Sequence, residues 1–299
     1  MNFDAFVKDI EDNKWKVYGA EVYENGKLLH SFGDTKGKYD IYSCTKSILS
    51  IALGIAWDRG LIDFDKNLFD YIPMDRLNIS KEAKDTFSKL SLRRFMTMSV
   101  EGFPFRPVSD DYLKEAFETN IKNVDNPSFE YSNFSPYLVG VALHYALGED
   151  LGLFIEENIF KAMEIEGYTY ERCPGGYFYS ASKMKLSVED MSKIGNMLLN
   201  KGIYKDRRIL SEEYINMATS VRQMNKEGGY GFYFWKYRDG FSINGKWKQK
   251  CYILPKKNLV ITYLSDIKDK SHELLHSMET NILGISDNDK TVVKCPVSD

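Results

Sequence analysis

Segments of strand-like composition lie at both ends of this chain, and helix-like segments lie between them. Residues 17–23 and 28–32 flank an Asn-Gly pair, which is typical of a tight β-hairpin turn. Residues 249–254 and 259–265 are apolar runs separated by a turn at Pro255. Strands from both ends can share one sheet if the helical middle is inserted between them. The pattern predicts an α/β fold of the α+β type, with one antiparallel sheet flanked by helices.

The same pattern predicts how the chain divides. We expect residues 1–64 and 202–299 to form an α/β domain that contains the sheet and the terminal helices, and residues 65–201 to form an all-helical domain. The chain has 299 residues, of which 43% are hydrophobic, so it can bury a large core. We expect the two parts to form one catalytic unit.

A long apolar helix is predicted directly after the N-terminal strands. It begins at Ser43 and is expected to stop before Gly60, a residue suited to the left-handed position after a helix. Because it is apolar on nearly every side, it should be buried. A serine at a helix start lies beside free backbone N–H groups, and Lys46, one turn further on, shares its face. Ser43 and Lys46 are therefore a candidate nucleophile and base.

Two further short motifs follow Ser43-Cys44-Thr45-Lys46 in the chain: Tyr131-Ser132-Asn133 and Lys246-Trp247-Lys248. Each has a simpler interpretation when it stands alone: a helix cap, a turn before a helix and a solvent-facing strand lysine, respectively. The S-x-x-K spacing also recurs at 180–183, 182–185 and 265–268, and Y-x-N recurs at 214–216. The other serines do not precede a long apolar helix, so the sequence favours Ser43.

Protonation decides what these side chains can do. A free lysine has a pKa of about 10.4, so Lys46 can act as a base only if burial or a second cation lowers that pKa. We expect the buried helix and Lys246 to provide both effects. Two flanking ammonium groups would also favour the phenolate of Tyr131 as an alternative base. Asn133 can hold the Lys46 ammonium with its carbonyl and donate its amide to a substrate.

With these three motifs the chain resembles the serine β-lactamase and penicillin-binding-protein family, and within it the class C-like branch of esterases and D-amino-acid peptidases. Residues 60–65, 71–73, 90–98 and 129–133 extend the resemblance over most of the chain. The resemblance implies attack by Ser43, proton movement through Lys46 and Tyr131, and release of the acyl group by water. It also implies an oxyanion hole formed by the backbone N–H groups of Ser43 and Gln249.

The third motif departs from the family pattern. The family usually has glycine at its last position, where this chain has Lys248. Because glycine permits close approach of a ligand, Lys248 and the adjacent Trp247 should contact the substrate and narrow the site. We therefore expect a serine hydrolase that acts through an acyl-enzyme on carboxylic esters or small amides. The alternatives are a β-lactamase or penicillin-binding D-amino-acid peptidase, and a non-catalytic binding or sensor protein of the same fold.

Composition excludes other classes of function. The net charge of −3 and the scattered Lys and Arg residues argue against a nucleic-acid partner, which leaves a small ester, amide or peptide-like substrate. No apolar run reaches the roughly 18 residues of a membrane span, and the start does not resemble a secretion signal, so a cytoplasmic location is expected. We expect no metal and no cofactor, because the histidines and cysteines do not show metal-ligand spacing. These residues are His30, His144, His272, His276, Cys44, Cys173, Cys251 and Cys295.

Overall fold

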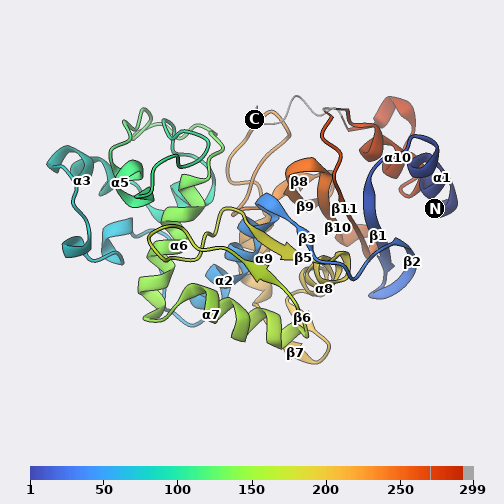
Figure 1. The fold of residues 1–299 in the computed structure, drawn as a ribbon, viewed down its shortest axis with the longest axis horizontal. Helices are drawn as coiled ribbons and strands as arrows, with labels where there is room; N and C mark the ends of the chain where they lie inside the picture. The colour runs from blue at the N-terminus through green and yellow to red at the C-terminus, as the bar shows by residue number, and fades with distance from the viewer. Residues whose placement is uncertain (270, 292–299) are drawn as a thin grey trace.

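The computed structural model of the protein describes residues 1–269 and 271–291 (Figure 1). The helices are α1 (Phe3–Asp12), α2 (Thr45–Asp58), α3 (Lys81–Phe87), α4 (Leu92–Met96), α5 (Tyr112–Phe117), α6 (Phe134–Leu147), α7 (Leu151–Ile155), α8 (Val188–Leu199), α9 (Glu212–Thr219) and α10 (Glu273–Asn281). The strands are β1 (Val17–Glu24), β2 (Lys27–Gly33), β3 (Tyr39–Asp40), β4 (Thr169–Tyr170), β5 (Met184–Leu186), β6 (Ile203–Tyr204), β7 (Arg207–Arg208), β8 (Trp235–Tyr237), β9 (Gly240–Gly245), β10 (Gln249–Leu254) and β11 (Leu259–Ser265).

The main sheet is antiparallel and has six strands in the order β2-β1-β11-β10-β9-β8. The central pair joins the two chain ends, with Ala20 opposite Tyr263. Asn25 and Gly26 have φ values of 52° and 73°, the left-handed pair that a tight hairpin requires. The predicted sheet from both chain ends is confirmed, and β10 and β11 have the predicted bounds.

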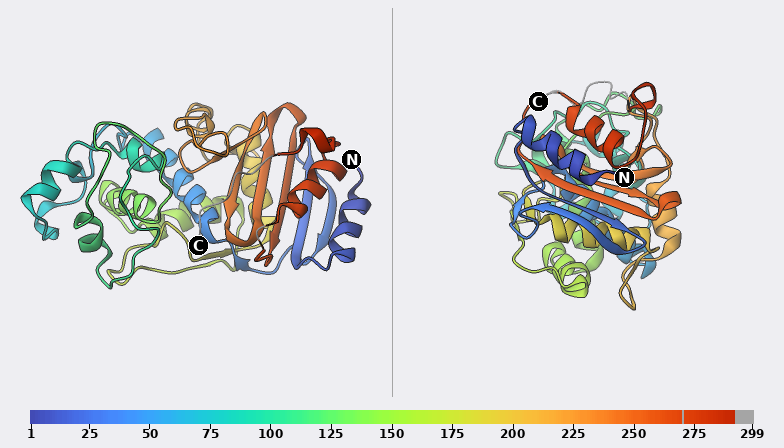
Figure 2. Two further views of the ribbon diagram at one scale, coloured as in Figure 1. Left: turned by 90° about the horizontal axis from the view of Figure 1, so that it is seen from above. Right: turned by 90° about the vertical axis from the view of Figure 1, so that its right-hand side faces the viewer.

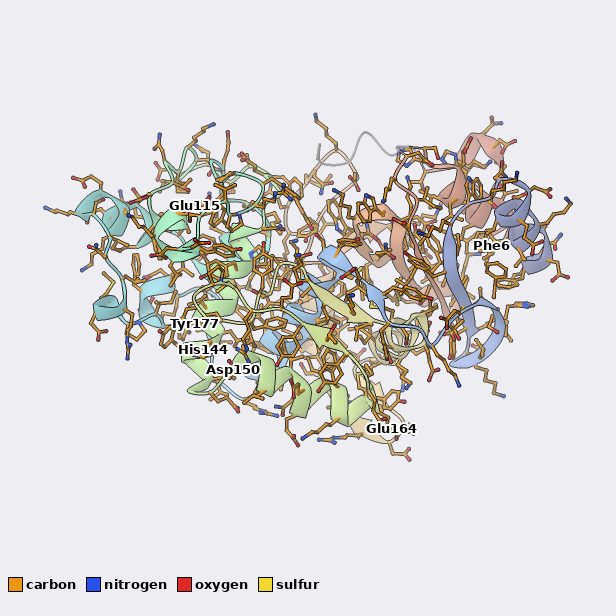
Figure 3. All side chains as sticks on the ribbon, viewed as in Figure 1. Phe6, Glu115, His144, Asp150, Glu164 and Tyr177 are labelled. Carbon is orange, nitrogen blue, oxygen red and sulfur yellow. The ribbon has the colours of Figure 1, made fainter. Side chains whose placement is uncertain are left out.

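Helices cover both faces of this sheet (Figure 2). On one face, α1 and α10 lie side by side and bury a small core that includes Phe6, which is labelled in Figure 3. The opposite face packs on α8 and joins a larger core that extends through α2 and α6. The start of α2 is thereby fixed between the sheet and the helical region.

The middle of the chain contains short strands as well as helices. β4 and β5 form a three-stranded sheet with β3, an arrangement that the sequence did not predict. These strands have two or three residues each, too few for a clear alternating pattern. α8 lies within the segment expected to be an all-helical domain, yet it packs against β1, β10 and β11. The division at 64/65 and 201/202 stays a prediction.

Two predicted strand segments near the C-terminus differ from the observed structure. The aromatic-rich composition of residues 230–237 predicts one strand, but only Trp235–Tyr237 form a strand, because Tyr233 has a left-handed φ of 64° and bends the chain. Lys246-Trp247-Lys248 form the turn between β9 and β10, with φ values of 58° at Trp247 and 67° at Lys248. Lys246 was expected on a strand, and this expectation was wrong.

Among the described residues, no single helix is long and apolar enough to cross a membrane. The bent pair Phe134–Leu147 and Leu151–Met163 meets that test of length and composition only when both helices are counted together. The expected cytoplasmic location stays a prediction. Cys44, Cys173 and Cys251 are buried free thiols, and Cys295 lies outside the described residues.

Candidate active site

Ser43 lies in a tight 3₁₀ turn, Tyr42–Cys44, that leads directly into α2. The α-helix therefore begins two residues later than predicted. Tyr42 has a left-handed φ of 46°, an uncommon conformation for a tyrosine. Its carbonyl accepts a hydrogen bond of 2.7 Å from the Thr45 hydroxyl. This bond holds the strained turn at the helix start and fixes the backbone on both sides of Ser43.

Lys46 is buried and its ammonium has three acceptors. Its Nζ donates to Ser43 Oγ at 2.9 Å, to Asn133 Oδ1 at 2.7 Å and to the Ala181 carbonyl at 2.8 Å. Burial nevertheless lowers the pKa of Lys46 to about 7, because desolvation penalises its charged form. The geometry expected for Ser43, Lys46 and Asn133 is present, and a fraction of Lys46 can be neutral near pH 7.

Tyr131 lies over the same lysine within a group of aromatic side chains. Its ring centroid is 4.9 Å from Lys46 Nζ, and its ring stacks on Trp235 with centroids 5.6 Å apart. Burial raises the pKa of Tyr131 well above its usual value, although a hydrogen bond with the Ser43 hydroxyl opposes the shift. Burial therefore favours the neutral phenol of Tyr131 over the phenolate expected from the sequence. Tyr131 is a neutral phenol that can donate a proton.

The strand end nearest the serine turn is that of β9. A Cβ added to Gly245 would lie 2.3 Å from the Ile41 carbonyl oxygen and 3.0 Å from Cys44 Sγ. Only glycine permits this approach. Gly245 and Lys246 line the cavity that contains Ser43, so the Lys246 backbone N–H is a candidate for the second oxyanion donor.

Gln249 follows the same turn, and its backbone N–H was the expected second donor. Its side chain is buried and donates to the carbonyls of Lys246 at 3.0 Å and Ser265 at 2.6 Å. It is not a lining residue of the cavity that contains Ser43. These side-chain contacts stabilise the strained β9–β10 turn. The assignment of the Gln249 backbone N–H to the oxyanion hole stays a prediction.

Trp247 and Lys248 both line the cavity. Their contact with a substrate stays a prediction. The Trp247 ring packs edge-on against Tyr42, with centroids 4.9 Å apart. Lys248 Nζ donates to the Ser271 carbonyl and lies 3.9 Å from the Asp269 carboxylate. Lys248 therefore links the turn to the segment before α10.

The cavity has a volume of about 270 Å³, near the lower limit of small-molecule sites. Its lining also includes Phe105 and Trp235, which belong to aromatic stretches that could form an apolar wall, and Glu227 and Lys250, to which the sequence analysis gave no role in the site. Burial raises the pKa of Glu227 and lowers that of Lys250. Side chains alternate along β10, so Lys250 lies on the face of the sheet opposite to that of the buried Cys251. Only this alternation could have indicated in advance on which face Lys250 lies.

The competing S-x-x-K motifs do not form such a pair. Lys183 lies 3.7 Å from Glu171, Lys185 lies 4.0 Å from Asp40, and Lys268 lies 3.6 Å from Asp266. Ser180 and Ser265 donate to the backbone carbonyls of Pro136 and Trp247. These contacts are structural, so Ser43 is the serine that the fold places beside a buried lysine.

The described residues contain no cluster of three or more His, Cys, Asp or Glu side chains able to hold a metal. His144, Asp150 and Tyr177 lie together in the helical region (Figure 3). Asp150 is held there by a bidentate contact with Arg172. These contacts within the helical region account for the cluster of His144, Asp150 and Tyr177.

The sheet between two chain ends, with a serine turn before a buried helix and a lysine one turn further on, defines the architecture of serine β-lactamases and penicillin-binding proteins. A model of the Beta-lactamase family matches residues 6–277, and the chain belongs to this family. No curated protein sequence matches the chain significantly.

Solved structures agree with this family assignment at the level of the fold. A class C β-lactamase from Rhodobacter sphaeroides is 16% identical with a TM-score of 0.73, over 94% of this chain and 99% of that chain. An octameric penicillin-binding protein homologue from Pyrococcus abyssi is 15% identical with a TM-score of 0.74, over 97% and 79% of the chains. FmtA from Staphylococcus aureus is 14% identical with a TM-score of 0.74, over 99% and 92%.

Proposed function

We propose that the protein is a serine hydrolase that forms an acyl-enzyme on Ser43 and acts on carboxylic esters or small amides. The observation that carries the proposal is the contact of 2.9 Å between Ser43 Oγ and Lys46 Nζ, together with a Lys46 pKa of about 7. A neutral amine at this distance can take the hydroxyl proton.

The steps follow from the positions of these groups. Ser43 Oγ attacks the substrate carbonyl carbon, and its proton passes to Lys46 Nζ. The developing oxyanion is stabilised by the backbone N–H groups of Ser43 and Lys246. When the bond to the leaving group breaks, the neutral phenol of Tyr131 donates a proton to it and is reprotonated from Lys46. Water then attacks the acyl-enzyme by the same route in reverse and releases a carboxylic acid.

A fluorophosphonate tests this proposal, because it phosphonylates an activated serine. Intact-mass measurement should find one added group on the wild-type chain, located on Ser43. Ser43→Ala should abolish labelling and lower turnover of p-nitrophenyl acetate by up to roughly a million-fold. The matched control is Ser182→Ala, which removes the serine of a competing motif and should label like the wild type. Labelling that persists in Ser43→Ala would discard the assignment.

A penicillin in a parallel experiment separates the alternatives. A stable penicilloyl adduct on Ser43 would favour a penicillin-binding D-amino-acid peptidase, and rapid release of penicilloic acid would favour a β-lactamase. A chain labelled by neither reagent would be a binding or sensor protein. We expect the fluorophosphonate to react faster than the penicillin. Trp247 and Lys248 line the cavity at the turn beside Gly245, and their side chains should narrow the space for a bulky bicyclic ring.

A further inference from the structure

Three buried oxygen atoms on β1 and α8 have no hydrogen-bond partner among the described residues. They are Glu21 Oε2, Ser192 Oγ and Asn196 Oδ1. The Glu21 residue is only 3% exposed, and Ser192 is completely buried. An unpaired polar atom is costly inside a protein, because it has lost its hydrogen bonds to water. Three such atoms on elements that pack together therefore indicate a shared partner.

The fold brings these three side chains to one interface. Glu21 lies on the central strand pair, opposite Thr262 of β11, and α8 packs against both β1 and β11. Ser192 and Asn196 are four residues apart on α8, so they share one face of that helix. The Ser192 hydroxyl is near enough to favour the ionised form of Glu21, yet it makes no hydrogen bond of normal geometry. The helix face with both oxygen atoms is thus the face beside the carboxylate.

The local contacts of α8 leave both oxygen atoms available. Asn196 Nδ2 donates to the Ser192 carbonyl at 2.9 Å, which uses the nitrogen of the amide and leaves its oxygen unpaired. The hydroxyl groups of Ser88 and Thr219, at the ends of two other helices, donate to the carbonyl four residues earlier. Ser192 Oγ does not use this common local acceptor. Its oxygen therefore remains open to a ligand.

The charges around Glu21 do not balance. Glu189 lies near it, but the Glu189 carboxylate is paired with Lys193 at 3.2 Å. Burial raises the pKa of Glu21 and Glu189 adds to this shift, because both disfavour the ionised carboxylate. Two carboxylates and one ammonium leave one negative charge, beside the phenols of Tyr23 and Tyr204. A cation would compensate this charge, whereas a water molecule would not.

We propose that Glu21, Ser192 and Asn196 bind an alkali-metal cation, K⁺ or Na⁺, that joins α8 to the central strand pair. Carboxylate, hydroxyl and amide oxygen atoms are ligands that hard cations prefer. Two of the three ligands are neutral, which suits one positive charge better than two. The site uses no His or Cys, so the spacing of those residues could not indicate it. None of its three residues lines the cavity that contains Ser43, and the inference does not depend on the proposed function.

Thermal unfolding followed by circular dichroism tests the site, in KCl, NaCl and tetramethylammonium chloride at equal ionic strength. We expect a midpoint higher by about 2–4 °C in KCl or NaCl, because a ligand that binds only the folded chain stabilises it. Glu21→Gln should abolish the difference between the salts, since it removes the charge that the cation compensates. Glu157→Gln, an equal change at an exposed carboxylate paired with Lys161, is the control and should retain the difference.

A second variant and a direct observation complete the test. Ser192→Ala removes one ligand and should narrow the difference between the salts even if Glu21→Gln does not fold. Tl⁺ substitutes for K⁺ and scatters X-rays anomalously, so crystals soaked in thallous acetate should show a peak between Glu21 and Asn196. If a proton on Glu21 satisfies these atoms instead, stability should fall with rising pH and should not depend on the cation. Equal midpoints of the wild type in all three salts, a difference that Glu21→Gln retains, or the absence of the Tl⁺ peak would overturn the site.

Discussion

The two walls of the cavity are built differently. On the helical wall, Ser43 contacts the buried Lys46, which is held by three hydrogen bonds of 2.7–2.9 Å to acceptors in different parts of the chain. On the sheet wall, Trp247 and Lys248 line the cavity from a turn in which both have left-handed backbone. Groups that move protons need fixed positions, whereas groups that select a substrate can tolerate variation. We infer that the helical wall carries the chemistry and the sheet wall carries specificity.

The sharpest test of the helical wall is Tyr131→Phe. It removes only the phenol oxygen and keeps the ring that stacks on Trp235. Because the neutral phenol is the proposed acid, we expect kcat/KM for a p-nitrophenyl ester to fall by roughly a hundred- to ten-thousand-fold. Thermal unfolding should change little. Near wild-type turnover would reduce Tyr131 to a packing residue and leave proton transfer to Lys46 alone.

Gly245→Ala tests the junction of the two walls. The new Cβ would meet the Ile41 carbonyl oxygen at 2.3 Å, so the strand or the serine turn must move. We expect a loss of about 1–3 kcal/mol in the free energy of unfolding, measured by urea titration, and lower turnover in the folded fraction. Gly175→Ala is the control, since its added Cβ would meet its nearest neighbour at 3.7 Å. Equal stability of the two variants would contradict the close approach.

Lys248→Gly tests specificity on the sheet wall. We expect the wild type to hydrolyse short p-nitrophenyl esters and to turn over a chromogenic cephalosporin weakly or not at all. Glycine suits the φ of 67° and removes a side chain from the cavity wall, so the ratio should shift toward the cephalosporin. The shift should not exceed about 1–3 kcal/mol of transition-state binding. An unchanged ratio would show that Lys248 does not restrict the site.

The smallest expected effect is a shift in the pH profile. Since neutral Lys46 is the proposed base, kcat/KM should rise tenfold per pH unit below about pH 7 and level off above it. Asn133→Leu removes an acceptor that stabilises the Lys46 ammonium and keeps water out. The pKa of Lys46 should therefore fall further, moving the rise to lower pH by about one unit. A shift to higher pH would mean that Asn133 does not stabilise the charged form.

The helical wall was largely predictable from the sequence, and the sheet wall was not. Ser43 and Lys46 lie one turn apart, so local periodicity alone brings them together. Tyr131 and Asn133 depend on family resemblance, but their motif is compact enough to be recognised. On the other wall, Lys246 and Gln249 were separated by a turn with left-handed residues, which no periodic pattern reveals. The choice between their backbone N–H groups as the second oxyanion donor could therefore not be made from the sequence.

The surroundings of individual side chains account for the other differences between the sequence-based predictions and the structure. The pKa of Tyr131 depends on the aromatic residues that surround it, and these come from distant segments. Glu227 lies in a loop of no regular pattern, and its approach to Lys250 follows from the tertiary fold. Charges and short motifs are visible in a sequence, but the dielectric surroundings that set their protonation require coordinates.

The pairing of β1 with β11 has a consequence for synthesis of the chain. Val17 pairs with Ser265, so the middle of the sheet joins two segments that lie 248 residues apart in the chain and leave the ribosome at different times. At the usual rates of translation, the N-terminal hairpin must wait on the order of ten seconds or more for its partner strand. During that interval β1 has an open edge, which favours association with other chains. Nascent chains of this protein should therefore depend on chaperones more than their size alone suggests, and Ser43 should gain reactivity only after β11 has emerged.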